Sequence, residues 1–330
     1  MKNINCLFLG DLNIDIIMNI NQYPLPGNES TANKTDTYIG GSALNSAIVF
    51  AKLGNPSFMM GAMGIDHWSE IIETGLRDIA VDLSKVKKKS EFSTGFNFIP
   101  ITPDGERTMF GNRGANKTFS PEDIDAHALD KIDLVHISGY VFLSSPQKEA
   151  AWKLVLMAEE RNIPISLDTT YEVASLYPAE IHRLLPKLTI CSMGIREAQA
   201  IFETQDMQLI EDKLRDMNIN LSAIKMGSKG CLLITKTTSI HFPSFSIDPI
   251  DTTGAGDAFC AGLITSWIHN CSLNTVGALS SLLGALAVSK PGAGVELPGK
   301  VEIRSNLHRI GELKDFNPQE IEQTLSSMFY

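Results

Sequence analysis

The seven residues from Asp251 to Asp257 place a loop of small residues directly before a carboxylate. The apolar spacing that follows predicts a helix from about Gly256 to Asn270. The first N–H groups of a helix have no partner within it, so they can hold an anion such as a transferring phosphoryl group. Small residues let the anion approach the backbone closely. We therefore predict an anion hole at Gly254, Ala255 and Gly256.

Asp257 follows these small residues where a carboxylate can take the proton of an attacking hydroxyl group. That chemistry is general-base catalysis of phosphoryl transfer. The simpler interpretation is that Asp257 caps the predicted helix. The loop by itself leaves both interpretations open.

A second polar group follows an apolar strand near the N-terminus. Residues 6–10 predict a buried strand, and the alternation after it places Asp11, Asn13 and Asp15 on one face. Ionised aspartates accept hydrogen bonds from sugar hydroxyl groups, which predicts a binding site. A solvated edge strand explains the same pattern equally well.

The elements that position these residues follow two patterns. Polar strands are expected within residues 11–39 and 92–113, and together they predict a small β-sheet that forms a lid. From residue 133 onward, strands and helices alternate, which predicts a doubly wound, mostly parallel α/β sheet flanked by helices. Such sheets bind ligands beyond the carboxyl ends of their strands. We expect a single domain over residues 1–330.

The composition narrows the classes of function. A chain of 330 residues with 43% apolar residues can bury a large core. Its formal charge of -10 opposes nucleic-acid binding. The basic residues 85–89 are expected to form a solvated loop. Five scattered cysteines predict buried thiols in a reducing cytoplasm. No apolar run approaches the roughly 18 residues of a membrane span, so no membrane partner is expected.

Residues 251–259 resemble the carboxyl-terminal signature of the ribokinase-like, or phosphofructokinase-B, carbohydrate kinases. Residues 40–47, 52–54 and 61–66 are similar to the amino-terminal signature of that family, so the resemblance covers essentially the whole chain. It implies ATP-dependent phosphorylation of a hydroxyl group on a sugar or sugar-like small molecule, with Asp257 as general base. The substrate contacts that the resemblance implies are Asp15, Gly40, Gly41 and Asn45, and Asn13 falls beside Asp15.

The resemblance also indicates how ATP and Mg²⁺ are held. Residues 225–230 resemble the nucleotide-binding turn, and residues 290–294 match the loop that walls the adenine in relatives. The usual Asn-x-x-Glu magnesium motif is Gly194-Ile195-Arg196-Glu197 here, so the Glu remains and the Asn is absent. The expected contacts are Ser192, Lys225, Gly227, Gly230 and Gly292 for the nucleotide, Glu197 indirectly for Mg²⁺, and Asp251 and Thr253 for a monovalent cation such as K⁺.

Two arginines, Arg107 and Arg113, fall on the predicted lid near three phenylalanines, where they can close over the substrate or remain solvated. Arg113 is the one assigned to the substrate. Residues 168–172 lack the Arg of the Asp-Pro-Asn-x-Arg pattern of several relatives, which disfavours an acidic sugar.

Three alternatives compete with a sugar kinase. A nucleoside kinase of the same fold would stack a base on lid aromatics, for which Tyr38, Phe96 and Phe98 are candidates. A non-catalytic sugar-binding protein would share the fold without the chemistry, although Asp257 and its small residues are all present. A dinucleotide-dependent oxidoreductase would need a G-x-G-x-x-G turn after the first strand, which is missing. Relatives often dimerise through the lid, which makes a homodimer an expectation.

Overall fold

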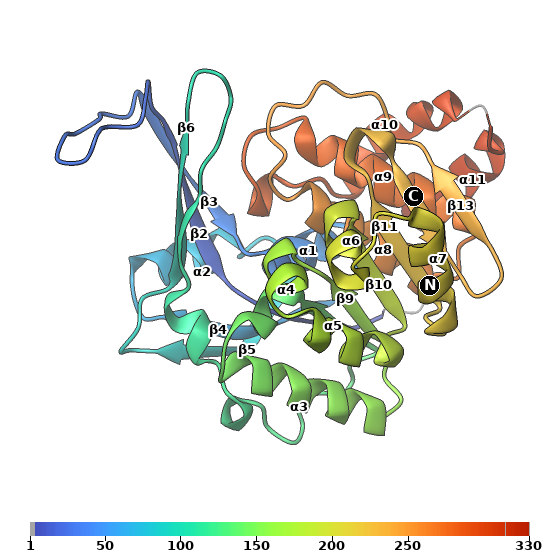
Figure 1. Ribbon diagram of the computed structural model, residues 1–330, viewed down its shortest axis with the longest axis horizontal. Helices are drawn as coiled ribbons and strands as arrows, with labels where there is room; N and C mark the ends of the chain where they lie inside the picture. Colours follow the sequence, from blue (N-terminus) through green and yellow to red (C-terminus); the bar gives the residue numbers. More distant parts are fainter. Residues whose placement is uncertain (1–3, 314, 330) are drawn as a thin grey trace.

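Nine strands form one sheet in the computed structural model, which describes residues 4–313 and 315–329. The strand order is β13-β12-β11-β10-β9-β8-β1-β4-β5, parallel from β11 to β5 and antiparallel at β12 and β13. The strands are β1 Cys6–Leu9, β4 Ser57–Gly64, β5 Val81–Lys89, β8 Leu134–Ser138, β9 Ile165–Asp168, β10 Ile190–Gly194, β11 Leu221–Lys225, β12 Cys231–Ile234 and β13 Ser239–Phe242. The prediction of a mostly parallel α/β sheet is confirmed (Figure 1).

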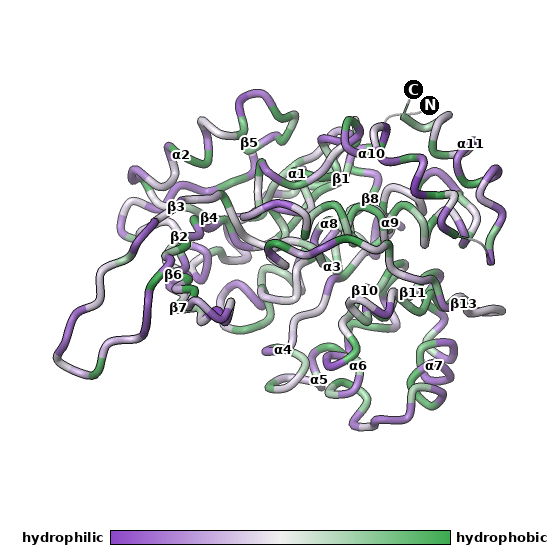
Figure 2. Tube along the Cα trace, turned by 90° about the horizontal axis from the view of Figure 1, so that it is seen from above, coloured by the Kyte–Doolittle hydropathy of each residue, from purple (hydrophilic) through white to green (hydrophobic). Residues whose placement is uncertain are grey.

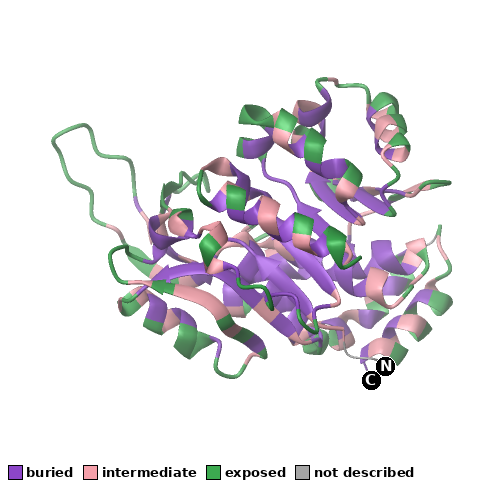
Figure 3. Ribbon diagram, turned by 90° about the horizontal axis from the view of Figure 1, so that it is seen from below, coloured by how far each residue is buried: buried purple, intermediate pink, exposed green. Residues whose placement is uncertain are grey.

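Helices cover both faces of this sheet because its central strands are apolar on both sides. Alternate residues of β1 enter different cores: Phe8 belongs to one cluster, Leu7 to the other. The first core is covered by α1 Ser42–Lys52, α2 His67–Gly75, α8 Ala255–Ile268, α9 Leu273–Val288, α10 Lys300–Asn306 and α11 Pro318–Phe329. The second is covered by α3 Gln147–Glu160, α4 Tyr171–Leu176, α5 Pro178–Leu184, α6 Ile195–Phe202 and α7 Met207–Asp216. Figure 3 shows the buried strands between these helices.

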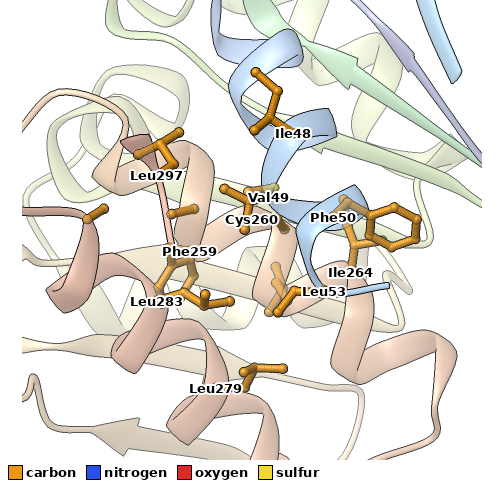
Figure 4. Packing of buried hydrophobic residues seen from close by; sticks show 14 of the residues in the cluster. Ile48, Val49, Phe50, Leu53, Phe259, Cys260, Ile264, Leu279, Leu283 and Leu297 are labelled. Carbon is orange, nitrogen blue, oxygen red and sulfur yellow. The ribbon is translucent and has the colours of Figure 1, made fainter. Parts of the chain in front are cut away.

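The helix that begins after Gly41 packs directly on the helix that begins after Gly254. Figure 4 shows Val49 of α1, and Leu53 directly after it, close to side chains of α8 and α9, and these residues belong to one buried cluster. This apolar packing holds the first turns of α1 and α8 beside each other. The two signature segments, about two hundred residues apart in the chain, therefore meet at one place.

A separate four-stranded sheet forms the predicted lid. Its order is β3-β2-β6-β7, with β2 Asn13–Asn19, β3 Lys34–Gly40, β6 Gly95–Ile101 and β7 Phe110–Asn112. Residues 21–31, between β2 and β3, are all exposed. Figure 2 shows hydrophilic residues along much of this sheet and its loops. The two polar strand groups expected from the sequence do pair with each other, because β2 and β6 are parallel neighbours.

The basic segment at residues 85–89 is a strand, so the expectation of a solvated loop is wrong. It belongs to β5, which pairs only with β4 and forms the sheet edge. Lys88 pairs with Glu73 at 2.9 Å and Lys89 with Asp123 at 2.8 Å. Lysines suit an edge strand because they discourage pairing with a further strand.

All five cysteines are free thiols, and four of them are buried. Burial raises the pKa of Cys231 to about 12 and that of the half-buried Cys271 to about 11. These thiols are therefore protonated and unreactive at neutral pH. In the described ranges, no helix has both the length and the apolar character needed to cross a bilayer.

Candidate active site

The first turn of α8 offers unpaired backbone donors. Gly254 is the N-cap residue and has a φ of 75°, in the left-handed region that favours glycine. Within the described part of the chain, the N–H groups of Gly256 and Asp257 donate to no other group. These donors point outward from the start of a helix, which is the geometry of an anion site.

The Asp257 carboxylate is held by α1. Ser42 Oγ donates to Oδ1 at 2.8 Å, and Asn45 Nδ2 donates to Oδ2 at 2.7 Å. Asn45 is itself fixed, because its Oδ1 accepts the N–H of Gly294 at 3.0 Å. Burial raises the pKa of Asp257 to about 6, although the hydrogen bonds from Asn45 and Ser42 oppose the rise. A carboxylate so placed is oriented from outside its own helix, unlike a capping residue.

The lid presents Asp15 on the same side as Asn97 and Tyr38, its direct partners in β6 and β3. Asn97 Nδ2 donates to Asp15 Oδ1 at 2.7 Å, and Oδ2 has no partner among the residues described. Burial raises the pKa of Asp15. A Cβ atom on Gly40 would collide with this carboxylate, so glycine is required there. Asp15 therefore retains an open acceptor.

Asp11 and Asn13 are already occupied. Arg113 forms a bidentate ion pair with Asp11 at 2.9 and 2.8 Å, and Gln147 donates to the same carboxylate at 2.8 Å. Asn13 Oδ1 accepts from Asn116 Nδ2 at 2.9 Å. Of the three polar residues expected to share an open face, Asp15 is thus the one that keeps an unpaired acceptor among the residues described. Whether Arg113 or Asn13 contacts the substrate remains a prediction.

The loop before α8 is tied to the late loop and to the lid. Asp251 Oδ1 accepts from Thr253 N–H at 2.9 Å, and Oδ2 accepts from Gly292 N–H at 2.9 Å. Burial alone would raise the pKa of Asp251, but these hydrogen bonds outweigh it and lower that pKa. Arg107, from the lid, donates to Thr253 Oγ1 at 2.7 Å and lies 3.5 Å from Asp251 Oδ1. The loop before α8 therefore carries an ionised carboxylate in contact with a lid cation.

The carboxyl ends of β9, β10 and β11 bring together charged groups. Lys225 Nζ donates to Asp168 Oδ1 at 2.6 Å. Glu197 accepts from Gly194 N–H at 2.8 Å and from Thr169 Oγ1 at 2.5 Å. Burial raises the pKa of Glu197, although Lys225 opposes the rise. This is the strand end where a parallel sheet is expected to bind ligands.

The remaining expected nucleotide residues lie beside this cluster or beyond it, and Ser192 is the direct strand partner of Asp168. Gly227 and Gly230 have φ values of 60° and 86° in the turn between β11 and β12, which explains glycine at both positions. Ser192 is fully buried in β10, and its Oγ has no hydrogen-bond partner in the described ranges. A Cβ atom on Gly292 would collide with the ring of Tyr38, so the late loop packs against the lid.

Residues 3–300 match the family described as pfkB family carbohydrate kinase. The chain belongs to this family. Among curated relatives, it is 27% identical over 290 residues to an ATP-dependent ribose-1-phosphate kinase from Halopiger xanaduensis, covering 88% of this chain and 94% of the relative. It is 25% identical over 315 residues to the aminoimidazole riboside kinase of Salmonella typhimurium, covering 90% and 93%. Among solved structures, Arabidopsis thaliana ribokinase complexed with ribose and ATP has a TM-score of 0.80 at 22% identity, covering 92% and 98%.

The protein is thus a ribokinase-family sugar or nucleoside kinase. Phe96 and Phe98, two of the three aromatic residues considered for stacking on a base, lie on the wrong face of the small sheet for that role. Phe96 and Phe98 pair with Ile14 and Ile16, so they lie on the face of the small sheet opposite Asp15. Their rings contact each other at 5.3 Å. Only Tyr38 among the three candidates is on the Asp15 side.

Several residues of the kinase site escaped the sequence analysis. Ser42 lies beside the paired glycines, so its position could have been inferred from the signature. Asn97, Asp168 and Thr169 carry no such signal. Strand pairing brings Asn97 to Asp15, whereas the sheet order and the position of α6 bring Asp168 to Lys225 and Thr169 to Glu197. Arg196, which lies within the altered magnesium motif, is exposed, with its guanidinium carbon 4.4 Å from the centroid of the Tyr171 ring.

Proposed function

We propose that this kinase transfers the γ-phosphoryl group of ATP to a hydroxyl group of a sugar or sugar-like molecule, with Asp257 as general base. The observation that carries the proposal is the juxtaposition of an oriented, partly buried carboxylate and the unpaired N–H groups of one helix turn. A base and an anion hole are the two parts that phosphoryl transfer to a hydroxyl group requires.

In the proposed step, Asp257 accepts the proton of the substrate hydroxyl group, and the oxygen of that hydroxyl group forms a bond to the γ-phosphorus. The bond from that phosphorus to the β–γ bridging oxygen breaks, and ADP leaves. Gly254, Ala255 and Gly256 are proposed to stabilise the charge on the transferring group, chiefly through the unpaired N–H of Gly256, because the N–H of Ala255 donates to Thr252 O at 3.4 Å. Ser42 and Asn45 keep the base aligned.

The substrate is proposed to lie between the lid and α1. Asp15 Oδ2 accepts from one hydroxyl group, and Asn45 lies on the other side of the site next to the base. The glycines at 40 and 41 leave room beside them; a Cβ at either would collide with Asp15 or with the backbone of Asp11. Arg113 and Asn13 are proposed to support this site through Asp11 and Asn116.

The nucleotide is proposed to lie over the ends of β9 to β11. Lys225, Gly227, Gly230, Gly292 and Ser192 are the chain's proposed contacts to it. Mg²⁺, which neutralises phosphate charge when bound, fits beside Glu197, because a partly buried carboxylate held by Thr169 and Gly194 can order the ion's water shell.

The test is ADP release by the purified chain with Mg-ATP across pentoses, hexoses, sugar phosphates and nucleosides. Turnover that depends on one acceptor class supports the proposal and names the substrate. No turnover with any acceptor, together with a sugar-induced thermal shift, would leave a non-catalytic sugar-binding protein.

A nucleoside acceptor is the second candidate. Its support is the similarity to a riboside kinase over most of both chains and the placement of Tyr38 on the Asp15 side of the lid. Preference for a nucleoside over its free pentose in the same assay would establish it.

The pH dependence should report the raised pKa of the base. Asp257 must be ionised to accept a proton, so kcat/KM should fall as pH drops below a pKa of about 6 and level off above it. Ser42→Ala removes a hydrogen bond that favours the ionised form, so it should move this inflection to higher pH. An inflection in the wild type that Ser42→Ala does not move would exclude Asp257 as the titrating base.

Potassium is proposed to activate the enzyme at Asp251 and Thr253. The lowered pKa of Asp251 keeps a negative charge there at neutral pH, which supports cation binding. The rate in potassium should exceed the rate in tetramethylammonium at equal ionic strength. Equal rates would remove potassium from the proposal and leave Arg107 as the cation of this loop.

We further infer that residues 1–330 act as one kinase domain, with lid strands within 11–39 and 92–113, in the cytoplasm. A homodimer through the lid is proposed from the exposed Phe98, Met109 and Phe110 on it. Sedimentation of the purified chain measures the oligomeric state.

A further inference from the structure

Lys225 lies at the edge of the proposed anion hole. Its Nζ would be 3.3 Å from a Cβ atom on Gly256, the residue whose N–H is unpaired at the start of α8. The ammonium carries three donors, and its one hydrogen bond among the described residues goes to Asp168. The Lys225 side chain as a whole is 19% exposed. Two N–H donors therefore remain for an anion beside Gly256.

The same region lacks the asparagine of the family's magnesium motif. Gly194 stands in its place, and a Cβ atom there would meet Glu197 Oε1 at 3.0 Å. Glu197 thus bends back toward the backbone of Gly194, where it accepts a hydrogen bond at 2.8 Å. The uncharged asparagine side chain of the family's motif is therefore absent from this chain. On the adjacent strand, the residue paired with Gly194 is the cation Lys225.

We propose that Lys225 is a catalytic residue that contacts the transferring phosphoryl group and takes over charge stabilisation that the family's asparagine serves through Mg²⁺. This inference rests on the proposed phosphotransfer. Lys225 donates to the phosphoryl oxygens as charge moves onto them, while Asp168 fixes its position.

The local charges support this role. Three carboxylates, Asp168, Glu197 and Asp257, face this end of the sheet, and Lys225 interacts electrostatically with each of them. A phosphoryl group entering beside Gly256 would otherwise meet negative charge on several sides, which is costly in a site of low polarity. Asp168 and Glu197 also keep the ammonium protonated despite its burial, by raising its pKa.

The experiment compares wild type with Lys225→Met by two readouts. The first is kcat with Mg-ATP, expected to fall about 100-fold, as for loss of one transition-state donor. The second is the affinity for Mg·AMP-PNP relative to Mg·ADP, measured by calorimetry without acceptor. This ratio should fall about tenfold in the variant, because only AMP-PNP carries a γ-phosphoryl group.

Two further variants separate contact from structural support. Lys153→Met removes a partly buried lysine that donates to Pro121 O and Ile124 O, away from the site, and should leave both readouts unchanged. Asp168→Asn with Lys225→Met removes both charges of the ion pair, so no buried carboxylate is left unpaired. Wild-type kcat and affinity ratio in this double variant would overturn the proposal, because Lys225 would then only neutralise Asp168. An unchanged ratio in folded Lys225→Met would overturn it as well.

A failure of the proposed phosphotransfer can be distinguished from a failure of the inference about Lys225. A wild type without turnover that loses its AMP-PNP preference in Lys225→Met would refute phosphotransfer to the tested acceptors while supporting the phosphoryl contact.

Discussion

Asp257→Asn should lower kcat by about a thousandfold, within the range known for loss of a general base. The amide cannot accept the hydroxyl proton, whereas the anion hole and the nucleotide contacts remain. KM for ATP should therefore change little. The measurement is steady-state ADP release with the acceptor found in the substrate panel.

Stability should not explain this loss. Burial makes the ionised carboxylate costly, as the raised pKa of Asp257 indicates. The neutral amide removes this cost, which offsets its weaker hydrogen bond to Asn45. The melting temperature at neutral pH should stay close to that of the wild type. Asp212→Asn, which removes one carboxylate on α7, is the matched control and should keep wild-type kcat. Retention of more than a tenth of wild-type kcat by Asp257→Asn would reject the base assignment.

Asp15→Asn should raise KM for the sugar at least about thirtyfold, because a hydrogen bond to a charged group contributes about 2 kcal/mol. The amide still accepts from Asn97 through Oδ1, so the lid strand pairing is kept. Its nitrogen, however, replaces the Oδ2 acceptor that we assign to a substrate hydroxyl group. The loss should fall mainly on KM, since Asp15 does not touch the transferring group in the proposed mechanism.

The control for this variant lies on the same sheet. Asp36 of β3 forms an ion pair with Lys34 at 2.7 Å, and Asp36→Asn removes a lid carboxylate without a proposed role. It should leave KM for the sugar within about twofold, as expected for an exposed pair. Equal effects of the two variants would indicate that lid charge in general, rather than Asp15, controls binding.

Local sequence predicted the helix start at the proposed anion hole because its parts are contiguous. The helix start, the glycine at its N-cap and the carboxylate in its first turn all follow from seven neighbouring residues. The small sheet was likewise predicted in outline, since the polar strand patterns of residues 11–39 and 92–113 are local properties.

Register and partner choice were not predictable in this way. The face of β6 that carries Asn97 rather than Phe96 depends on its pairing with β2. The Asp11 carboxylate forms an ion pair with Arg113, which lies 102 positions away in the chain. No local pattern indicates this pairing. The lysines of residues 85–89 were misjudged because an edge strand and a loop are equally polar in sequence.

The sequence by itself determined the family and the α/β class, and it supplied the proposal of a base with its anion hole, because these depend on local spacing and on signature residues. Only the tertiary structure decided which carboxylates remain open, which cation stands beside the proposed anion hole and which face of the small sheet carries Asp15. Those features depend on contacts between residues distant in the chain. Apolar packing of α1 on α8, and the pairing of strands within each sheet, sets those contacts.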